Sequence, residues 1–198
     1  MQENDPSTAD IRRSSRRFRL KKTVALVGMM GAGKTAVGRS VAAKLGVPFL
    51  DSDAEIEAAA NLSVPEIFQR DGEAFFRKRE AEVIRRLLEA RRGILSTGGG
   101  AYLAQTNRDN IREKGVALWL DADLDLLWNR VRHKDTRPLL RTADPRATLA
   151  GIFHDRTPVY QLAELRVVCA ADLSIDAMAE RVIATLLTRA DVLEVADV

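Results

Sequence analysis

The sequence predicts an α/β fold in three layers, with a five-stranded parallel sheet between two layers of helices. Short apolar and β-branched runs have the length and composition of buried strands at 23–27, 47–50, 93–97, 116–120 and 165–169. The segments between several of these runs carry apolar residues at helical spacing, and such alternation is typical of parallel sheets covered on both faces. A glycine-rich loop also follows the first run directly, at residues 28–35.

The helical segments follow from apolar periodicity and from capping residues. Apolar spacing and stop signals predict helices at 35–45, 53–60, 73–91, 123–132, 144–156 and 174–188. Ser63 and Glu66 form a capping-box pattern that predicts a further short helix, and Ser174 is a suitable cap for the last one. The 144–156 helix is expected to end before Pro158, because proline interrupts helical hydrogen bonding.

The glycine-rich loop has the form G-x-x-x-x-G-K-[ST], which is the pattern of a phosphate-binding loop. It lies between a predicted strand and a predicted helix, the context that this motif requires. Its glycines permit positive φ angles, so that successive backbone N–H groups can point toward a phosphate. Lys34 can bring positive charge to the β- and γ-phosphates, and the Thr35 hydroxyl can bind Mg²⁺. A nucleoside triphosphate site is therefore predicted; the alternative is a tight turn with an exposed lysine.

Two carboxylates follow the second predicted strand. Asp51 and Asp53 stand at i and i+2 of an extended segment, so their side chains point to the same side. The carboxyl end of a strand beside a phosphate loop is where open α/β sheets bind ligands. One carboxylate can help to hold Mg²⁺ while the other accepts a proton or a substrate hydroxyl. The alternative is that one of them simply caps the helix at 53–60.

An arginine and three glycines form a second candidate site. Arg77 lies beside the apolar stripe of the 73–91 helix, with Glu73 at i−4 and Glu80 at i+3. This pattern fits either a solvated, ion-paired face or an arginine that Glu80 orients toward a carboxylate. The glycines at 98–100 follow the third strand, and they cost stability unless a ligand or another backbone approaches closely. Proteins with a phosphate loop usually bind Mg²⁺ with a second group as well, a carboxylate at the end of a neighbouring strand. No aspartate ends the third strand, so Asp51 is the natural substitute.

Composition excludes several classes of protein. A chain of 198 residues is expected to form one domain, and no apolar run approaches the roughly 20 residues of a membrane helix. One cysteine (Cys169, expected to pack in the core) and two distant histidines make no zinc cluster, so any metal is expected to have oxygen ligands. The net charge of +3 is concentrated in residues 1–22, which hold seven basic and three acidic residues, whereas the remainder holds 24 and 25. The domain itself therefore gives no bulk signal for nucleic acid.

The ends of the chain are predicted to lie outside the domain. Residues 1–21 are polar and basic and are expected to be a disordered extension, residues 22–190 the domain, and residues 191–198 a tail without an assigned role. Residues 15–21 are similar to a twin-arginine export signal. The apolar stretch that follows them contains the strand and the phosphate loop, so cleavage there would destroy the fold. A cytoplasmic location is therefore expected, and the single cysteine agrees with it.

Taken together, the motifs resemble those of the shikimate kinase family. The phosphate loop, the Asp-x-Asp pair, Phe-Arg-x-x-Glu at 76–80, the triple glycine and Arg-Pro-Leu-Leu at 137–140 occur in the order and spacing of that family, across about 23–188. The resemblance implies a P-loop kinase fold with a mobile lid at about 132–143. It also implies ATP-dependent phosphorylation of the 3-hydroxyl of shikimate, in chorismate and aromatic amino acid biosynthesis. It further implies Mg²⁺, a monomer, and no nucleic-acid or membrane partner.

The resemblance also implies roles for single residues. For ATP binding it implies Gly31, Ala32, Gly33, Lys34, Thr35, Ala36, Arg130 and Arg137. For shikimate binding it implies Asp53, Arg77, Gly98, Gly99, Gly100 and Arg156. For the metal it implies Thr35 and Asp51, the latter through water. For catalysis it implies Lys34, Asp53 as base and Arg137 from the lid.

Two other functions remain open from the residues alone. Another small-molecule kinase of the same fold, acting on gluconate or a nucleotide, would share the phosphate loop, but the two arginines favour an acceptor that carries a carboxylate. A nucleotide-gated switch or a nucleic-acid module would use the basic extension. The stretch at 170–173 lacks the polar or basic residue that the family often has near the adenine, so the nucleotide preference is less well defined.

Overall fold

The computed structural model describes residues 17–133 and 138–196. Its main sheet has five strands in the order β3-β4-β2-β5-β6, and every neighbouring pair in it is parallel. In chain order the strands are β2 (Thr23–Val27), β3 (Phe49–Asp51), β4 (Ile94–Ser96), β5 (Gly115–Asp121) and β6 (Leu165–Val168). The predicted five-stranded parallel sheet is confirmed.

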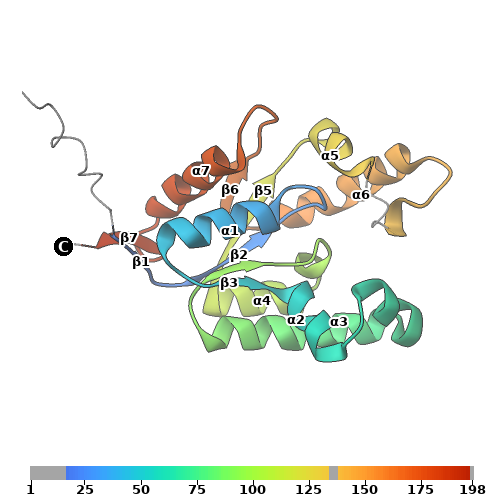
Figure 1. Cartoon of the computed structure of the whole chain (residues 1–198), viewed down its shortest axis with the longest axis horizontal. Helices are drawn as coiled ribbons and strands as arrows, with labels where there is room; N and C mark the ends of the chain where they lie inside the picture. Colours follow the sequence, from blue (N-terminus) through green and yellow to red (C-terminus); the bar gives the residue numbers. More distant parts are fainter. Residues whose placement is uncertain (1–16, 134–137, 197–198) are drawn as a thin grey trace, which may run out of the picture.

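Helices cover both faces of this sheet. Figure 1 shows α1 (Lys34–Leu45) and α7 (Ile175–Leu187) on one face, and α3 (Val64–Ala90) and α4 (Gln105–Lys114) on the other. The described chain also contains α2 (Ser52–Ala60), α5 (Leu124–Val131), α6 (Pro145–Tyr160) and the 3₁₀ helices η1 (Ala101–Leu103) and η2 (Pro138–Leu140). The three-layer arrangement is therefore as predicted.

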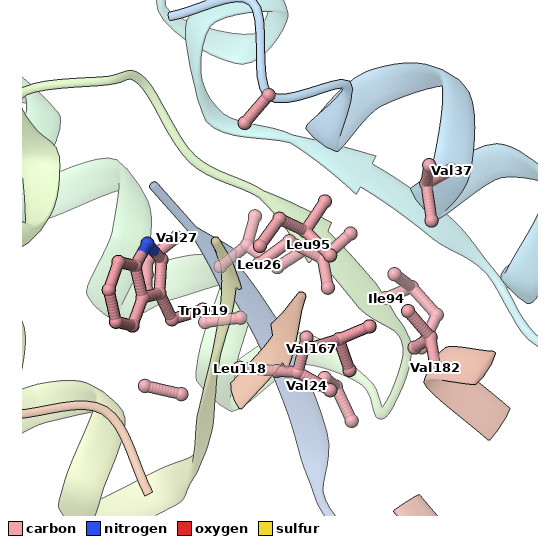
Figure 2. Close-up of a cluster of buried hydrophobic side chains, with 14 of the residues drawn as sticks. Val24, Leu26, Val27, Val37, Ile94, Leu95, Leu118, Trp119, Val167 and Val182 are labelled. Carbon is pink, nitrogen blue, oxygen red and sulfur yellow. The ribbon is translucent and has the colours of Figure 1, made fainter. Parts of the chain in front are cut away.

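The central strands are buried on both faces. All five residues of β2 are buried, and so are the first six of β5. Figure 2 shows Val37 of α1 and Val182 of α7 directed toward the strands that carry Leu26, Leu95 and Leu118. Helices on both sides require strands that are apolar throughout, which is why these segments lack the alternation of a half-exposed strand.

Polar caps set the limits of the helices as the sequence indicates. Ser63 and Glu66 form the predicted capping box at the start of α3, and the Ser174 hydroxyl accepts a hydrogen bond from the Ala177 N–H at the start of α7. The short helix and the long helix that were predicted separately are continuous in α3, apart from a break at Gly72, where φ is 82°. Only a glycine adopts this conformation without strain.

The predicted boundaries of the domain are wrong at both ends. Residues Arg17–Leu20, placed in a disordered extension, form strand β1, and residues Leu193–Ala196, placed in a tail, form β7. The two strands pair antiparallel with Leu20 opposite Leu193, as Figure 1 shows beside α1 and α7. Buried Val192 and Leu193 anchor the pair. Each segment is only four residues long, and their pairing joins opposite ends of the chain. The extension at 1–16 lies outside the described residues.

Two helical predictions also differ from the structure. Helix α6 continues through Pro158 to Tyr160. Pro158 lacks one N–H donor, but it lies in the last turn, and the Gln161 N–H after it still donates to Thr157 O at 3.0 Å. Helix α4 was not predicted. Its buried residues are Asn107 and Ile111, which leave too thin an apolar stripe to mark a helix in the sequence.

Candidate active site

A cleft of about 440 Å³ opens at the carboxyl ends of β2, β3 and β4. The phosphate loop forms its floor, and Asp51, Asp53 and the residues from Ser96 to Gly99 form one wall. This is the edge at which ligands bind in open α/β sheets. The parallel sheet thus brings together the two motifs that the sequence separates by some sixty residues.

The phosphate loop adopts the conformation that its glycines permit. Gly28, Gly31 and Gly33 have φ angles of 135°, 83° and 97°. A Cβ at Gly28 would lie 2.7 Å from Leu120 O, so this position excludes a side chain on steric grounds as well. The Lys34 ammonium is buried and donates hydrogen bonds to Gly28 O at 2.7 Å and Met29 O at 3.0 Å. The loop therefore holds its cation at the point where a phosphate chain would bind.

Oxygen atoms gather beside Lys34 where a magnesium ion is expected. The Thr35 hydroxyl lies 3.5 Å from Asp51 Oδ2 and 3.3 Å from the Ser96 hydroxyl. The other oxygen of Asp51 accepts hydrogen bonds from the N–H groups of Asp53 and Ala54, so Asp51 also caps α2. Hydroxyl and carboxylate oxygens are ligands that suit Mg²⁺. Ser96 was not predicted as a site residue, although it belongs to the motif that contains the triple glycine.

Asp53 lies in the first turn of α2, and one of its carboxylate oxygens, Oδ1, is buried without a hydrogen-bond partner among the described residues. Burial raises the pKa of Asp53 above its ordinary value; the charge of Asp51 adds to this, and that of Lys34 opposes it. A Cβ at Gly98 would lie 2.8 Å from that same oxygen. Asp53 also lines the cleft beside the triple glycine, so its carboxylate lies where a hydroxyl bound in the cleft can approach it.

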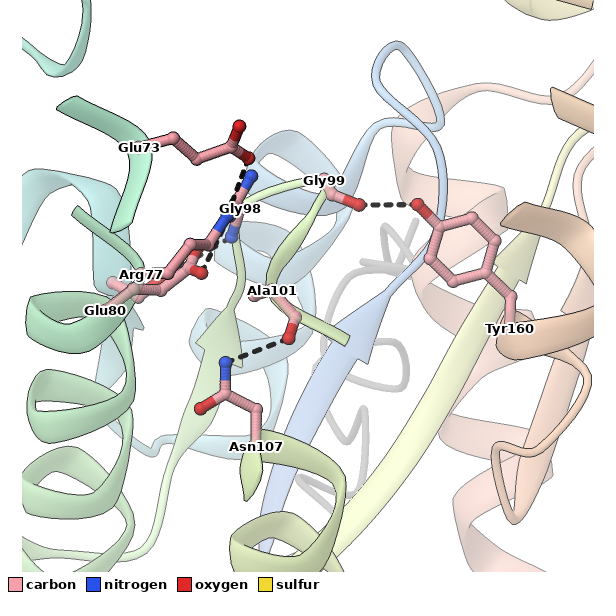
Figure 3. Close-up of polar contacts among 9 residues, drawn as sticks. Glu73, Arg77, Glu80, Gly98, Gly99, Ala101, Asn107 and Tyr160 are labelled. Atoms are coloured by element: carbon pink, nitrogen blue, oxygen red, sulfur yellow. Dashed lines mark hydrogen bonds and ion pairs between the residues drawn. The ribbon is translucent and has the colours of Figure 1, made fainter. Parts of the chain in front are cut away.

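Arg77 points toward the triple glycine from α3, held between two glutamates as Figure 3 shows. It pairs with Glu80 at 2.8 Å and with Glu73 at 3.4 Å. The Glu80 side chain is only 1% exposed, and burial raises its pKa while the Arg77 charge opposes this effect. The Arg77 guanidinium also lies over the rings of Phe76 and Phe68. The structure thus contains the ion pair between Arg77 and Glu80 that the sequence spacing indicates, and a carboxylate-binding role for Arg77 stays a prediction.

A second arginine reaches the same loop from α6. A Cβ at Gly99 would lie 4.0 Å from Arg156 Nη1, and one at Gly100 would lie 2.6 Å from Arg77 Nη2. None of the three glycines has a positive φ. Gly98 and Gly100 have little space for a side chain, whereas a Cβ at Gly99 would make only ordinary contacts. The structure thus brings together Arg77, Arg156 and Asp53 around residues 98–100, as the sequence predicted.

The outer wall of the cleft is largely apolar. Arg130 of α5 donates to Gly31 O and Ala32 O at 3.2 Å each. Beyond it the wall consists of Cys169, Leu173, Ile175 and Met178. Burial raises the pKa of the Cys169 thiol to about 11, so it is uncharged, and it is buried as predicted. Arg137 and residues 134–136 of the expected lid lie outside the described residues.

Comparison with known proteins agrees with this geometry. The family model described as "Shikimate kinase" matches residues 30–187. The chain is 67% identical over 175 residues to a shikimate kinase from Ruegeria pomeroyi, covering 88% of this chain and 90% of that relative. The chain belongs to the shikimate kinase family. It is also 43% identical over 182 residues to the shikimate kinase of Rhizobium meliloti, covering 92% and 94% of the two chains.

Solved structures of this family have the same fold. A shikimate kinase from Acinetobacter baumannii in complex with shikimate superposes with a TM-score of 0.80 at 34% identity, covering 85% of this chain and 94% of that one. A gluconokinase from Sinorhizobium meliloti superposes at 0.51 with 17% identity, covering 87% and 95%, and shares the fold alone. The P-loop kinase fold predicted from the motifs is thereby confirmed.

Proposed function

We propose that this chain transfers the γ-phosphoryl group of ATP to the 3-hydroxyl of shikimate, giving shikimate 3-phosphate and ADP in the route to chorismate and the aromatic amino acids. The observation that carries the proposal is the convergence of Arg77 and Arg156 on the triple glycine, next to a phosphate loop. Family membership supports it, as does the shikimate bound to the Acinetobacter baumannii relative.

The acceptor side of the cleft suits a cyclic polyol that carries a carboxylate. Two guanidinium groups can bind the carboxylate through charge-assisted hydrogen bonds, and guanidinium geometry matches carboxylate geometry. The triple glycine leaves room for a ring to approach the backbone closely. Asp53 lines the cleft, and its carboxylate can accept a hydrogen bond from the attacking hydroxyl and later take its proton.

The donor side neutralises the phosphate chain. The N–H groups of the loop and the positive end of α1 receive phosphate oxygens, and Lys34 leaves its carbonyl partners to bind the β- and γ-phosphates. Thr35, and Asp51 through water, would hold Mg²⁺, which neutralises developing charge on the phosphates when bound. Positioning and charge neutralisation supply most of the catalysis in phosphoryl transfer. The lid at about 132–143 and its Arg137 are proposed to close over the triphosphate.

The chain is proposed to act as a cytoplasmic monomer. Within residues 17–133 and 138–196, no helix combines the length and apolar character needed to cross a membrane. The excess of basic residues lies in residues 1–22, and the rest of the chain holds 24 basic and 25 acidic residues. This balance supports small molecules rather than nucleic acid as partners of the domain.

Arg77→Lys is expected to raise the KM for shikimate by about 10- to 100-fold and to change kcat much less. Lysine keeps the charge but loses the planar pair of donors and the contact with Glu80. Arg79→Lys is the matched control, because Arg79 lies on the same helix, half exposed, and pairs with Glu82 at 2.7 Å. Equal KM values for Arg77→Lys and the control would contradict a carboxylate-binding role for Arg77.

The proposed function is tested by identifying the product. Purified protein, ATP, Mg²⁺ and shikimate are incubated, and ³¹P and ¹H spectra are recorded. We expect one shikimate 3-phosphate for each ADP released. ADP accompanied by free phosphate would instead show an ATPase, and a phosphate on another hydroxyl would show that the acceptor is bound in a different orientation.

A further inference from the structure

A buried tyrosine holds the carbonyl in the middle of the acceptor loop, defined here as residues 98–101. Tyr160 is the last residue of α6, 1% exposed, and its hydroxyl donates a hydrogen bond to Gly99 O at 2.5 Å (Figure 3). Its ring stacks on Trp119 of β5 with centroids 6.4 Å apart. The ring therefore has a fixed position from which its hydroxyl reaches the loop.

The bond to Gly99 O also sets the direction of a backbone donor. The peptide group between Gly99 and Gly100 is planar, so its C=O and its N–H point in opposite directions. The Gly98 N–H donates to the Ser52 hydroxyl and the Ala101 N–H to Gly98 O. Among the described residues, the N–H groups of Gly99 and Gly100 have no acceptor. Holding the Gly99 carbonyl thus aims the Gly100 N–H away from Tyr160.

A loop of three glycines needs such a restraint. All three lie at ordinary φ angles, where glycine gains nothing from its freedom, and each loses more conformational entropy on ordering than any other residue would. Without an anchor, the peptide between two glycines can rotate with little steric resistance. On the far side of Gly100, Asn107 donates to Ala101 O at 2.9 Å, so the loop is held on both sides.

We propose that Tyr160 is a positioning residue for the acceptor substrate, holding the 99–100 peptide so that its N–H faces the polyol ring. The inference rests on the proposed function. It adds to that function a residue that acts through its neighbours, because the Tyr160 hydroxyl bonds to the loop carbonyl and also interacts with the Arg156 side chain. Arg156 stands one helical turn before Tyr160, so α6 supplies both a carboxylate ligand and the anchor of the neighbouring backbone. Burial raises the pKa of Tyr160, so its hydroxyl keeps the proton that it donates.

Tyr160→Phe tests the proposal because it removes the hydroxyl and keeps the ring on Trp119. We expect the KM for shikimate to rise on the order of tenfold, consistent with the loss of one buried hydrogen bond. We also expect the KM for ATP to stay within about twofold of the wild-type value and kcat to fall by less than about threefold. A merely structural role would instead lower the melting temperature and the active fraction, leaving both KM values unchanged.

Tyr102→Phe is the matched control. Tyr102 is buried in η1, directly after the acceptor loop, and its hydroxyl makes no hydrogen bond to any described residue. This variant should keep both wild-type KM values. If Tyr160→Phe keeps the wild-type KM for shikimate, or raises both KM values equally, while wild type and Tyr102→Phe phosphorylate shikimate, this proposal alone is wrong. No phosphorylation of shikimate by wild type would overturn the proposed function, and this inference with it.

Discussion

Replacing Lys34 with alanine is expected to lower kcat at least about 1,000-fold. The Lys34 ammonium is buried at the amino end of α1, where the phosphate chain would bind, and there it donates hydrogen bonds to two loop carbonyls. Without it, the negative charge that develops on the transferred phosphoryl group loses the cation that the phosphate loop supplies. Initial rates of ADP release at saturating ATP and shikimate measure the effect.

Two further variants separate the charge of Lys34 from its packing. Lys34→Met keeps the aliphatic volume, so it should fold as wild type does and be as inactive as Lys34→Ala. Lys44→Ala is the matched control, because Lys44 lies on the same helix and makes surface ion pairs with Asp176 and Glu180 at 3.0 and 2.7 Å. A turnover for Lys34→Met within tenfold of wild type would contradict the role of this cation in transfer.

Asp53→Asn is expected to lower kcat about 10²- to 10⁴-fold, the range of general-base assistance. Asparagine has the shape of aspartate and can still hydrogen-bond the substrate hydroxyl, but it cannot take the proton. Asp172→Asn, a change to an exposed carboxylate after β6, should leave the rate unchanged. A nearly wild-type rate for Asp53→Asn would show that the proton leaves by another route.

The raised pKa of Asp53 leads to two further expectations, one for the wild type and one for the Asp53→Asn variant. The acidic limb of kcat/KM in the wild type should lie above the ordinary pKa of 3.8, since the carboxyl must ionise before it can act as base. Because the folded-state pKa is raised, protonation favours the fold, and the stability that Asp53 contributes is lost as pH rises through that pKa. At neutral pH, therefore, Asp53→Asn should melt at a higher temperature than wild type despite its low activity.

The sequence predicted the central sheet and the phosphate loop well, because both depend on local patterns. Strand β2 agrees residue for residue with its prediction, since a fully buried parallel strand is apolar throughout and glycine marks its end. For Asp51 the structure shows the helix cap: one oxygen caps α2, while the other faces Thr35, where the metal is proposed to bind. Sequence patterns cannot show that a capping carboxylate leaves its second oxygen free to face the phosphate loop.

The features that the sequence did not predict depend on contacts between distant segments. The β1–β7 pair joins the two ends of the chain, and each segment is only four residues long, which is too short to indicate a strand by itself. Tyr160 was missed for a related reason. Helix α6 was expected to end before Pro158, which left Tyr160 in no element, so its position one turn beyond Arg156 on the same helix could not be inferred. The acceptor loop shows the same limit, because its anchors come from α4 and α6.

The proposed acceptor site is tested most directly by the rate of ADP release, coupled to NADH oxidation, with ATP, Mg²⁺ and each of four acceptors: shikimate, quinate, gluconate and AMP. We expect fast release with shikimate alone, because the two arginines and the glycine loop are arranged for a carboxylate on a polyol ring. Fast release with another acceptor, or with none, would contradict the assignment of the acceptor site while leaving the phosphate loop as a nucleotide site.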